Sequence, residues 1–109
     1  FLEGWRDDKF DVFGDGKLIL YFTPGHTPGH QSLLVNLEKS GPMFFAADSC
    51  YTLDNLDKMI LPGLAWHFGE TLKSVQRMKL LKDLHGVQIV TGHDPDAWKA
   101  YKQAPNFYE

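Results

Sequence analysis

Three polar residues in this sequence follow apolar runs of strand type and could do chemistry together. His30 ends the repeated segment TPGHTPGH, Asp48 directly follows MFFAA, and His93 stands shortly after VQIV. Strand ends meet at an edge of a sheet, so residues far apart in the chain can lie together there. Imidazole nitrogens and carboxylate oxygens suit zinc and similar divalent ions. The pattern therefore favours a metal site made of His30, Asp48 and His93.

The repeat contains a second histidine, His26, four residues before His30. This is the spacing of a zinc motif on a helix, but the proline and glycine between the two histidines prevent that helix. We therefore expect at most one of them to bind a metal. The other is expected to form a hydrogen bond within the loop or to support the ligand from behind.

Ordinary structural roles stay open for each of these residues, because a histidine beside a strand or an aspartate after one is common without a ligand. Asp94 precedes Pro95 and is expected to cap a helix. His67 and His85 are expected at the surface or at helix ends. Cys50 has no neighbouring base or activating charge in the sequence, so we expect it to be inert.

A strand meander is expected to position these residues in the first half of the chain. Short apolar runs bounded by turn residues predict strands at 18–22, 32–37 and 43–47. Glycines around Asp15 predict a hairpin turn between residues 12–13 and 17–22. The run LILYF (18–22) is apolar throughout, so we expect both of its faces to be covered. The loop 23–30 is rich in proline and glycine, which excludes a helix.

Helices and one further strand are expected in the second half of the chain. Residues 70–85 carry an apolar side chain every three residues, which is typical of a helix packed by one face, and Gly86 is its expected end. VQIV (87–90) predicts a short strand. Shorter helical segments are expected near 53–58 and over 96–102.

The amino-acid composition excludes several classes of protein. The chain has 109 residues, of which 43% are hydrophobic and 14% aromatic, and this excludes a disordered chain. A net charge of −3 without a basic stripe argues against nucleic-acid binding. No apolar run approaches the length that a membrane span requires. One cysteine, Cys50, excludes an intramolecular disulfide framework and fits a reducing compartment, so we expect a cytoplasmic protein.

Three segments of the chain resemble the second half of the metallo-β-lactamase-fold hydrolases. They are TPGHTPGHQSLLV (23–35), AADSCYT (46–52) and VTGHD (90–94). Within that superfamily they are most similar to the N-acyl-homoserine lactonases, and Tyr51, three residues after Asp48, carries that closer match. The resemblance implies an α/β fold, the four-layer αββα sandwich of metallo-β-lactamase type.

The resemblance also implies roles for individual residues. His30 is the implied ligand of a first metal ion, His93 of a second, and Asp48 bridges both ions. Two divalent ions are expected, with zinc as the expected metal. Tyr51 is the implied substrate-binding residue, with its hydroxyl directed at the substrate carbonyl, and Tyr51 and Asp48 are the implied catalytic residues. His26 matches a motif position that is not a ligand.

The sequence departs from this family in one respect, since no HxHxDH motif is present. That motif lies in the first half of the fold. We therefore expect residues 1–109 to be the C-terminal half, without the N-terminal half, and a start at Phe1 instead of methionine fits this. Three protein ligands over two metals are too few for a closed site, so we expect the chain alone to be inactive. Its apolar strands are expected to need the missing half as a partner layer.

The activity implied by the resemblance is that of a quorum-quenching lactonase. Such a hydrolase opens the lactone ring of N-acyl-homoserine lactones by attack of a metal-bridging hydroxide, and residues 59–68 are the expected apolar lining for the acyl chain. One alternative is another hydrolase of this fold, such as a glyoxalase-II-like thioesterase. A second is a catalytically silent fragment or subunit that only assembles with a partner. The expected partners are a small lactone and the missing half, with no nucleic acid or membrane, and a homodimer is left open.

Overall fold

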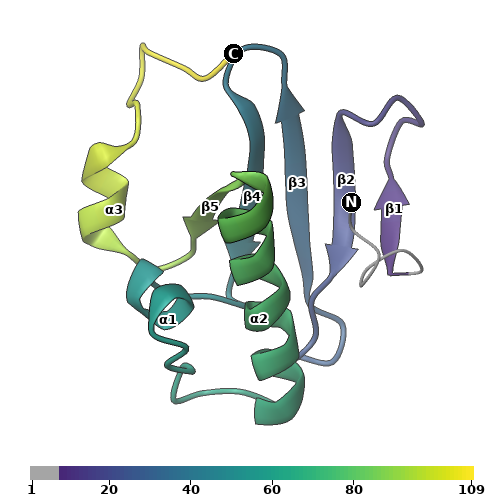
Figure 1. Cartoon of the computed structure of the whole chain (residues 1–109), viewed down its shortest axis with the longest axis vertical. Coiled ribbons are helices and arrows are strands. Elements are labelled where there is room, and N and C mark those ends of the chain that lie inside the picture. Colours follow the sequence, from purple (N-terminus) through teal and green to yellow (C-terminus); the bar gives the residue numbers. More distant parts are fainter. Residues whose placement is uncertain (1–7) are drawn as a thin grey trace.

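The computed structural model describes residues 8–109, which form one sheet with the longest helix in front of one face (Figure 1). The strands lie in sequence order across the sheet: β1 (Lys9–Asp11), β2 (Leu18–Phe22), β3 (Gln31–Leu37), β4 (Gly41–Ala47) and β5 (Gln88–Thr91). Strands β1 to β4 are antiparallel neighbours, whereas β5 is parallel to β4. A parallel pair needs a crossover, and the chain between β4 and β5 supplies it as helices α1 (Leu53–Asp57) and α2 (Phe68–His85). Helix α3 (Pro95–Ala100) follows β5.

Helix α2 covers one face of the sheet, and the core lies between them (Figure 1). Leu34, Phe44 and Ile89 are neighbours in register across β3, β4 and β5, and all are buried. From α2, the predicted apolar stripe buries Val75, Met78 and Leu81 against them, while Leu84 near its end is exposed. Within residues 8–109, no helix is both long and apolar enough to cross a membrane.

The opposite face of the sheet is apolar but carries no helix of the described chain. Pairing places one side chain from each strand in a single row across this face: Phe10, Leu20, Leu33, Phe45 and Val90. Phe10 is 65% exposed and Phe45 39% exposed, although neighbouring Phe44 on the helix face is fully buried. The expectation that LILYF is covered on both faces is therefore wrong for residues 8–109, because only Tyr21 of this strand is buried.

The first hairpin also differs from the prediction. Strand β1 pairs Lys9–Asp11 with β2, so Val12 and Phe13 lie in the connecting loop. The Asp11 carboxylate holds that loop by accepting hydrogen bonds from the backbone N–H of Gly14, at 3.0 Å, and of Gly16, at 2.8 Å. Sequence pattern missed β1 because its three residues are too few to show a period. The remaining predicted strands and helices are confirmed with boundaries shifted by one or two residues.

Strand direction brings the loops of interest to one edge of the sheet. The antiparallel pair β2–β3 places the end of β2 beside the start of β3, and the end of β4 lies at that same edge. Because β5 is parallel to β4, its carboxyl end lies there too. The loop 23–30, the residues after Ala47 and the residues after Thr91 therefore meet, as the sequence pattern predicted.

The loop 23–30 is fixed to the first turns of α2. The Ser74 hydroxyl donates to the carbonyl of Pro24 at 2.9 Å, and the carbonyl of Gly25 accepts from the backbone N–H of His67 at 3.0 Å. Gly25 is buried with a φ of +141°, and a Cβ there would lie 2.3 Å from the Thr71 Oγ1 atom. Only glycine fits this position, so the loop can lie directly on the helix.

Gly25→Ala is therefore expected to lower the free energy of unfolding by about 2–4 kcal/mol, through the backbone conformation and the overlap with Thr71. Gly29→Ala is the matched control, because Gly29 occupies the same position of the second TPGH copy and a Cβ there meets no atom within 4 Å. Urea unfolding of both variants checks the prediction. Equal losses of stability in the two variants would contradict it.

Candidate metal centre

His30 stands at the inner side of the candidate site, immediately before β3. Its Nδ1 atom is 2.8 Å from the Thr23 hydroxyl, and its Nε2 atom accepts a hydrogen bond from the backbone N–H of Asp48 at 3.2 Å. Burial lowers the pKa of His30, against the opposing effect of the Asp48 carboxylate. Neutral imidazole is the form that binds a metal, so the environment of His30 suits a ligand.

Asp48 is the centre of the cluster. It follows Ala47, a residue with a φ of +51°, at an irregularity in the pairing of β4 with β5. Its Oδ1 atom is 2.7 Å from the Nε2 atom of His93, and its Oδ2 atom is 3.6 Å from the Nε2 atom of His26. The carboxylate thus lies between imidazole rings from two different loops. A positive φ in a non-glycine residue beside such a cluster is the kind of strain that functional sites retain.

His93 is brought to Asp48 by backbone hydrogen bonds between the loops after β4 and β5. The N–H of Gly92 donates to the carbonyl of Cys50 at 3.0 Å, and the N–H of His93 donates to the carbonyl of Tyr51 at 2.8 Å. A Cβ at Gly92 would lie 2.4 Å from the carbonyl oxygen of Ala47. The absence of a side chain at Gly92 therefore permits the close approach that places His93 against Asp48.

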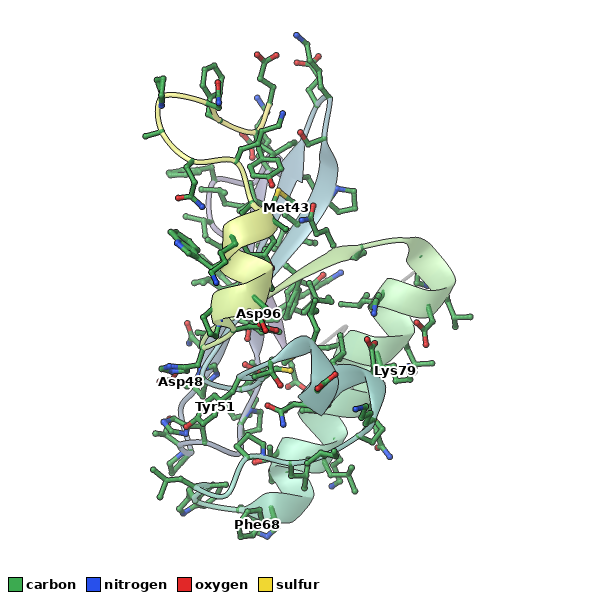
Figure 2. All side chains as sticks on the ribbon, turned by 90° about the vertical axis from the view of Figure 1, so that its left-hand side faces the viewer. Met43, Asp48, Tyr51, Phe68, Lys79 and Asp96 are labelled. Carbon is green, nitrogen blue, oxygen red and sulfur yellow. The ribbon has the colours of Figure 1, made fainter. Side chains whose placement is uncertain are left out.

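Tyr51 lies beside the same cluster. Its ring contacts the ring of His93 edge-on, with 4.7 Å between centroids, and its hydroxyl is 3.4 Å from the Nδ1 atom of His26. Figure 2 shows the labelled side chains of Asp48 and Tyr51 close together on one side of the molecule. His26 was expected to support a ligand or bond within its loop. The structure places it between Tyr51 and the carboxylate of the candidate ligand Asp48, a position that spacing alone does not reveal.

The residues expected to have structural roles have them. The Asp94 carboxylate caps α3 by accepting from the N–H of Ala97, and it also accepts from the N–H of Leu53, which lowers the pKa of Asp94. His67 caps α2 and His85 ends it. Cys50 is fully buried, and burial raises the pKa of its thiol to about 12, which confirms the expectation of an inert cysteine.

Sequence reasoning missed two further residues of the site, Thr23 and Ser32. Their hydroxyls are 2.8 Å apart, and the Ser32 hydroxyl donates to the carbonyl of Ala46 at 3.1 Å. Both side chains are buried behind His30. A hydroxyl residue at each end of the segment TPGHTPGHQS is the only sequence signal that could have pointed to them.

These donors fit a metal ion in part. Two imidazoles and one carboxylate, namely His30, His93 and Asp48, are of the right chemical type and converge on one edge of the sheet. However, residues 8–109 contain no group of three or more metal-ligating side chains arranged to hold an ion by themselves. The contact between Asp48 and His93 occupies an imidazole nitrogen and a carboxylate oxygen, the atom types that bind divalent ions, so a metal ion would compete with this hydrogen bond.

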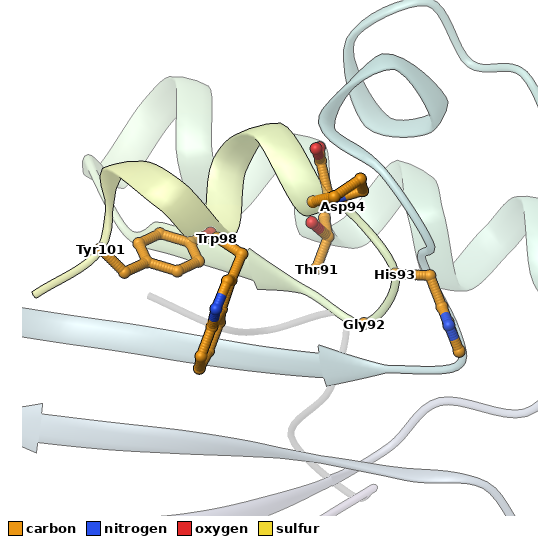
Figure 3. A pocket seen from close by; sticks show the side chains of 7 residues that line it. Thr91, Gly92, His93, Asp94, Trp98 and Tyr101 are labelled. Atoms are coloured by element: carbon orange, nitrogen blue, oxygen red, sulfur yellow. The ribbon is translucent and has the colours of Figure 1, made fainter. Parts of the chain in front are cut away.

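A shallow pocket of about 380 Å³ opens next to His93 (Figure 3). Its wall is formed by residues 91–95 and by the aromatic rings of Trp98 and Tyr101 on α3, which meet edge-on with 6.4 Å between centroids. Trp98 is 62% exposed. The pocket therefore offers an aromatic surface beside one of the candidate ligands.

The apolar segment 59–68 divides between core and surface. Met59 and Leu61 pack against the core, whereas Ile60, Leu64, Trp66 and Phe68 are exposed. The backbone N–H of Trp66 donates to the carbonyl of His26 at 3.2 Å. The exposed part of this segment therefore reaches the candidate site at Trp66.

Comparison with known proteins gives relatives that cover the whole chain. No family model matches. The chain is 49% identical over 109 residues to the N-acyl homoserine lactonase AttM of Azorhizobium caulinodans, which is 100% of this chain and 41% of that protein. It is 33% identical over 100 residues to the N-acyl homoserine lactonase AiiA of Bacillus thuringiensis subsp. kurstaki, which is 88% of this chain and 40% of the relative.

Solved structures show the same relationship. An N-acyl homoserine lactone hydrolase with the product N-hexanoyl-L-homoserine at its catalytic metal centre superposes with a TM-score of 0.81 and 30% identity, over 92% of this chain and 39% of that one. A probable metal-dependent hydrolase from Staphylococcus aureus, at 13% identity and a TM-score of 0.67, shares the fold. The resemblance and the fold class expected from the sequence are thereby confirmed. By sequence and by fold, this chain is similar to the N-acyl homoserine lactonases, and it spans about 41% of the length of the curated relatives it matches.

Proposed function

We propose that the protein containing this chain hydrolyses the lactone ring of N-acyl homoserine lactones. The observation that carries the proposal is the convergence of His30, Asp48, His93 and Tyr51 at one sheet edge, in a chain 49% identical to a lactonase. Because the chain spans about 41% of such relatives, the activity is assigned to the longer protein and not to residues 1–109 alone.

His30, Asp48 and His93 are the proposed metal ligands of this chain, with Asp48 shared between two divalent ions, of which zinc is the expected one. The donor types and the lowered pKa of His30, caused by burial, support this assignment. The remaining ligands are proposed to come from an HxHxDH motif outside this chain. When bound, such ions make water a nucleophile near neutral pH and polarise the substrate carbonyl.

The proposed reaction adds water across the ring ester. The water oxygen bonds to the lactone carbonyl carbon, the ring C–O bond breaks, and the leaving oxygen takes up a proton to give the N-acyl-homoserine. Tyr51 is proposed to donate a hydrogen bond to the carbonyl oxygen as negative charge develops there. Its hydroxyl lies 3.4 Å from His26 and its ring packs against His93, which supports this role because both neighbours line the candidate site.

The face of the sheet opposite α2 supports a proposal about where the missing N-terminal half packs. The row of Phe10, Leu20, Leu33, Phe45 and Val90 is apolar and partly exposed in residues 8–109. An exposed apolar face of this kind marks a surface meant for a partner. We propose that the N-terminal half of the αββα sandwich packs here, so that its ligands reach the edge that carries Asp48.

The acyl chain of the substrate is proposed to lie along the exposed part of residues 59–68. Leu64 and Trp66 are 70% and 57% exposed, and the backbone N–H of Trp66 donates a hydrogen bond to the carbonyl of His26. Apolar side chains at the rim of a polar site give an acyl tail a surface to bury.

A cytoplasmic location remains part of the proposal, since the chain has one cysteine and it is buried and unpaired.

A thioesterase of the same fold and a silent subunit are the competing functions. The test is turnover by the metal-loaded intact protein of an N-acyl homoserine lactone and of an acyl thioester. We expect lactone hydrolysis that is abolished by a chelator and restored by zinc, with thioester turnover lower by about 100-fold or more. Turnover of the thioester alone would replace the proposal with the thioesterase, and turnover of neither substrate would favour the silent subunit.

Tyr51→Phe is expected to lower kcat for the lactone by about 100-fold, because a hydrogen-bond donor to the developing charge is lost. Metal content should stay unchanged, since the proposed role of Tyr51 is toward the substrate. Tyr108→Phe is the control, because the Tyr108 hydroxyl accepts from the backbone N–H of Lys102 near the end of the chain and takes no part in the cluster. Steady-state kinetics with elemental analysis checks both variants, and loss of metal in Tyr51→Phe would show that the assigned role is wrong.

A further inference from the structure

We propose that Thr23 and Ser32 are positioning residues that hold His30 as its Nδ1–H tautomer, with Nε2 unprotonated beside the candidate metal centre. The two hydroxyls link the His30 ring to the backbone of β4 through three successive contacts of 2.8, 2.8 and 3.1 Å. The proposal concerns the protonated nitrogen of His30 in the metal-free protein. Its consequence for metal affinity rests on the proposed function.

The direction of this hydrogen-bond chain follows from counting donors. The carbonyl of Ala46 can only accept, so Ser32 uses its one hydroxyl proton there. In the contact between Ser32 and Thr23, the proton must then come from Thr23. Thr23 has no second proton, so in the last contact the Nδ1–H of His30 donates to Thr23.

The other side of the His30 ring favours the same tautomer. Its Nε2 atom lies 3.2 Å from the backbone nitrogen of Asp48, which carries a proton and can only donate. A proton on Nε2 would place two donors against each other. The lone pair of Nε2 therefore points toward the backbone N–H of Asp48, beside the candidate metal centre.

Burial makes the alternative tautomer costly. Thr23 is fully buried and Ser32 is 2% exposed, so water cannot supply a replacement partner for either hydroxyl. A proton on Nε2 would leave the Asp48 N–H without its acceptor and would require the Thr23 and Ser32 protons to reverse. Reversal would leave the carbonyl of Ala46 without its donor, and unsatisfied buried polar groups are destabilising.

The TPGH repeat shows that this role belongs to one of its two threonines. Thr27 occupies in the second copy the position that Thr23 holds in the first, yet Thr27 is exposed. The chain therefore contains a matched threonine outside the hydrogen-bond network. A metal needs a deprotonated nitrogen, and a fixed Nδ1–H tautomer keeps the proton off Nε2, so metal binding has to displace only the Asp48 N–H from that nitrogen.

The first experiment is nitrogen-15 NMR of the histidine side chains in the metal-free intact protein, at a pH where His30 is neutral. Two-bond couplings distinguish a proton on Nδ1 from one on Nε2. The expected result is the Nδ1–H tautomer for His30. A His30 ring protonated on Nε2 would overturn the proposal, whether or not the protein hydrolyses lactones.

The second experiment measures zinc affinity by competition with a chelator, together with the same spectra, in three variants. Thr23→Val should lose the single Nδ1–H tautomer and weaken zinc binding by about 10- to 100-fold, whereas Thr23→Ser and Thr27→Val should keep both properties. Unchanged tautomer and affinity in Thr23→Val would overturn the proposal. If Thr23→Val does not fold, Ser32→Ala replaces it: this variant removes the acceptor of the Thr23 proton and should also lose the single tautomer.

Discussion

The parallel pairing of β4 with β5 is the constraint on which the site depends. It sends the carboxyl ends of both strands to one edge of the sheet, and it places Asp48 and His93 after those ends. The pairing requires a crossover, and α2 both makes that crossover and covers the sheet. The same helix holds the loop 23–30, because Pro24 and Gly25 lie directly on it. One helix therefore builds the core and fixes the loop that carries His26 and His30.

The chemistry of this edge is that of a carboxylate surrounded by imidazoles. Asp48 accepts from His93 at 2.7 Å and lies 3.6 Å from His26, and its backbone N–H contacts His30. A proton and a metal compete for the same carboxylate and imidazole atoms, so metal occupancy should weaken as the pH falls. The described residues do not complete a site by themselves, and the apolar face with Phe45 is also uncovered in them. Both features fit a chain that spans about 41% of its relatives.

Much of this arrangement could be predicted from the sequence, because short apolar runs bounded by proline and glycine mark the strands, and the residues that follow them must lie at strand ends. The roles of Asp94, His67 and Cys50 followed from local sequence as well. Strand β1 was missed because Lys9–Asp11 is too short for a pattern. The coverage of LILYF was misjudged because an apolar strand does not reveal whether its second layer is present. Thr23, Ser32 and the position of His26 depend on tertiary contacts, which spacing along the chain does not encode.

Metal content of the intact protein tests the central claim most directly, namely that Asp48 with His30 and His93 forms part of a two-metal hydrolase centre. Elemental analysis after purification with excess divalent metal should give about two ions per protein in the wild type. Asp48→Asn should fall below one, since a shared ligand needs charge as well as oxygen, while Asp96→Asn on α3 should match the wild type. Fewer than one ion in the wild type, or full occupancy in Asp48→Asn, would contradict the account.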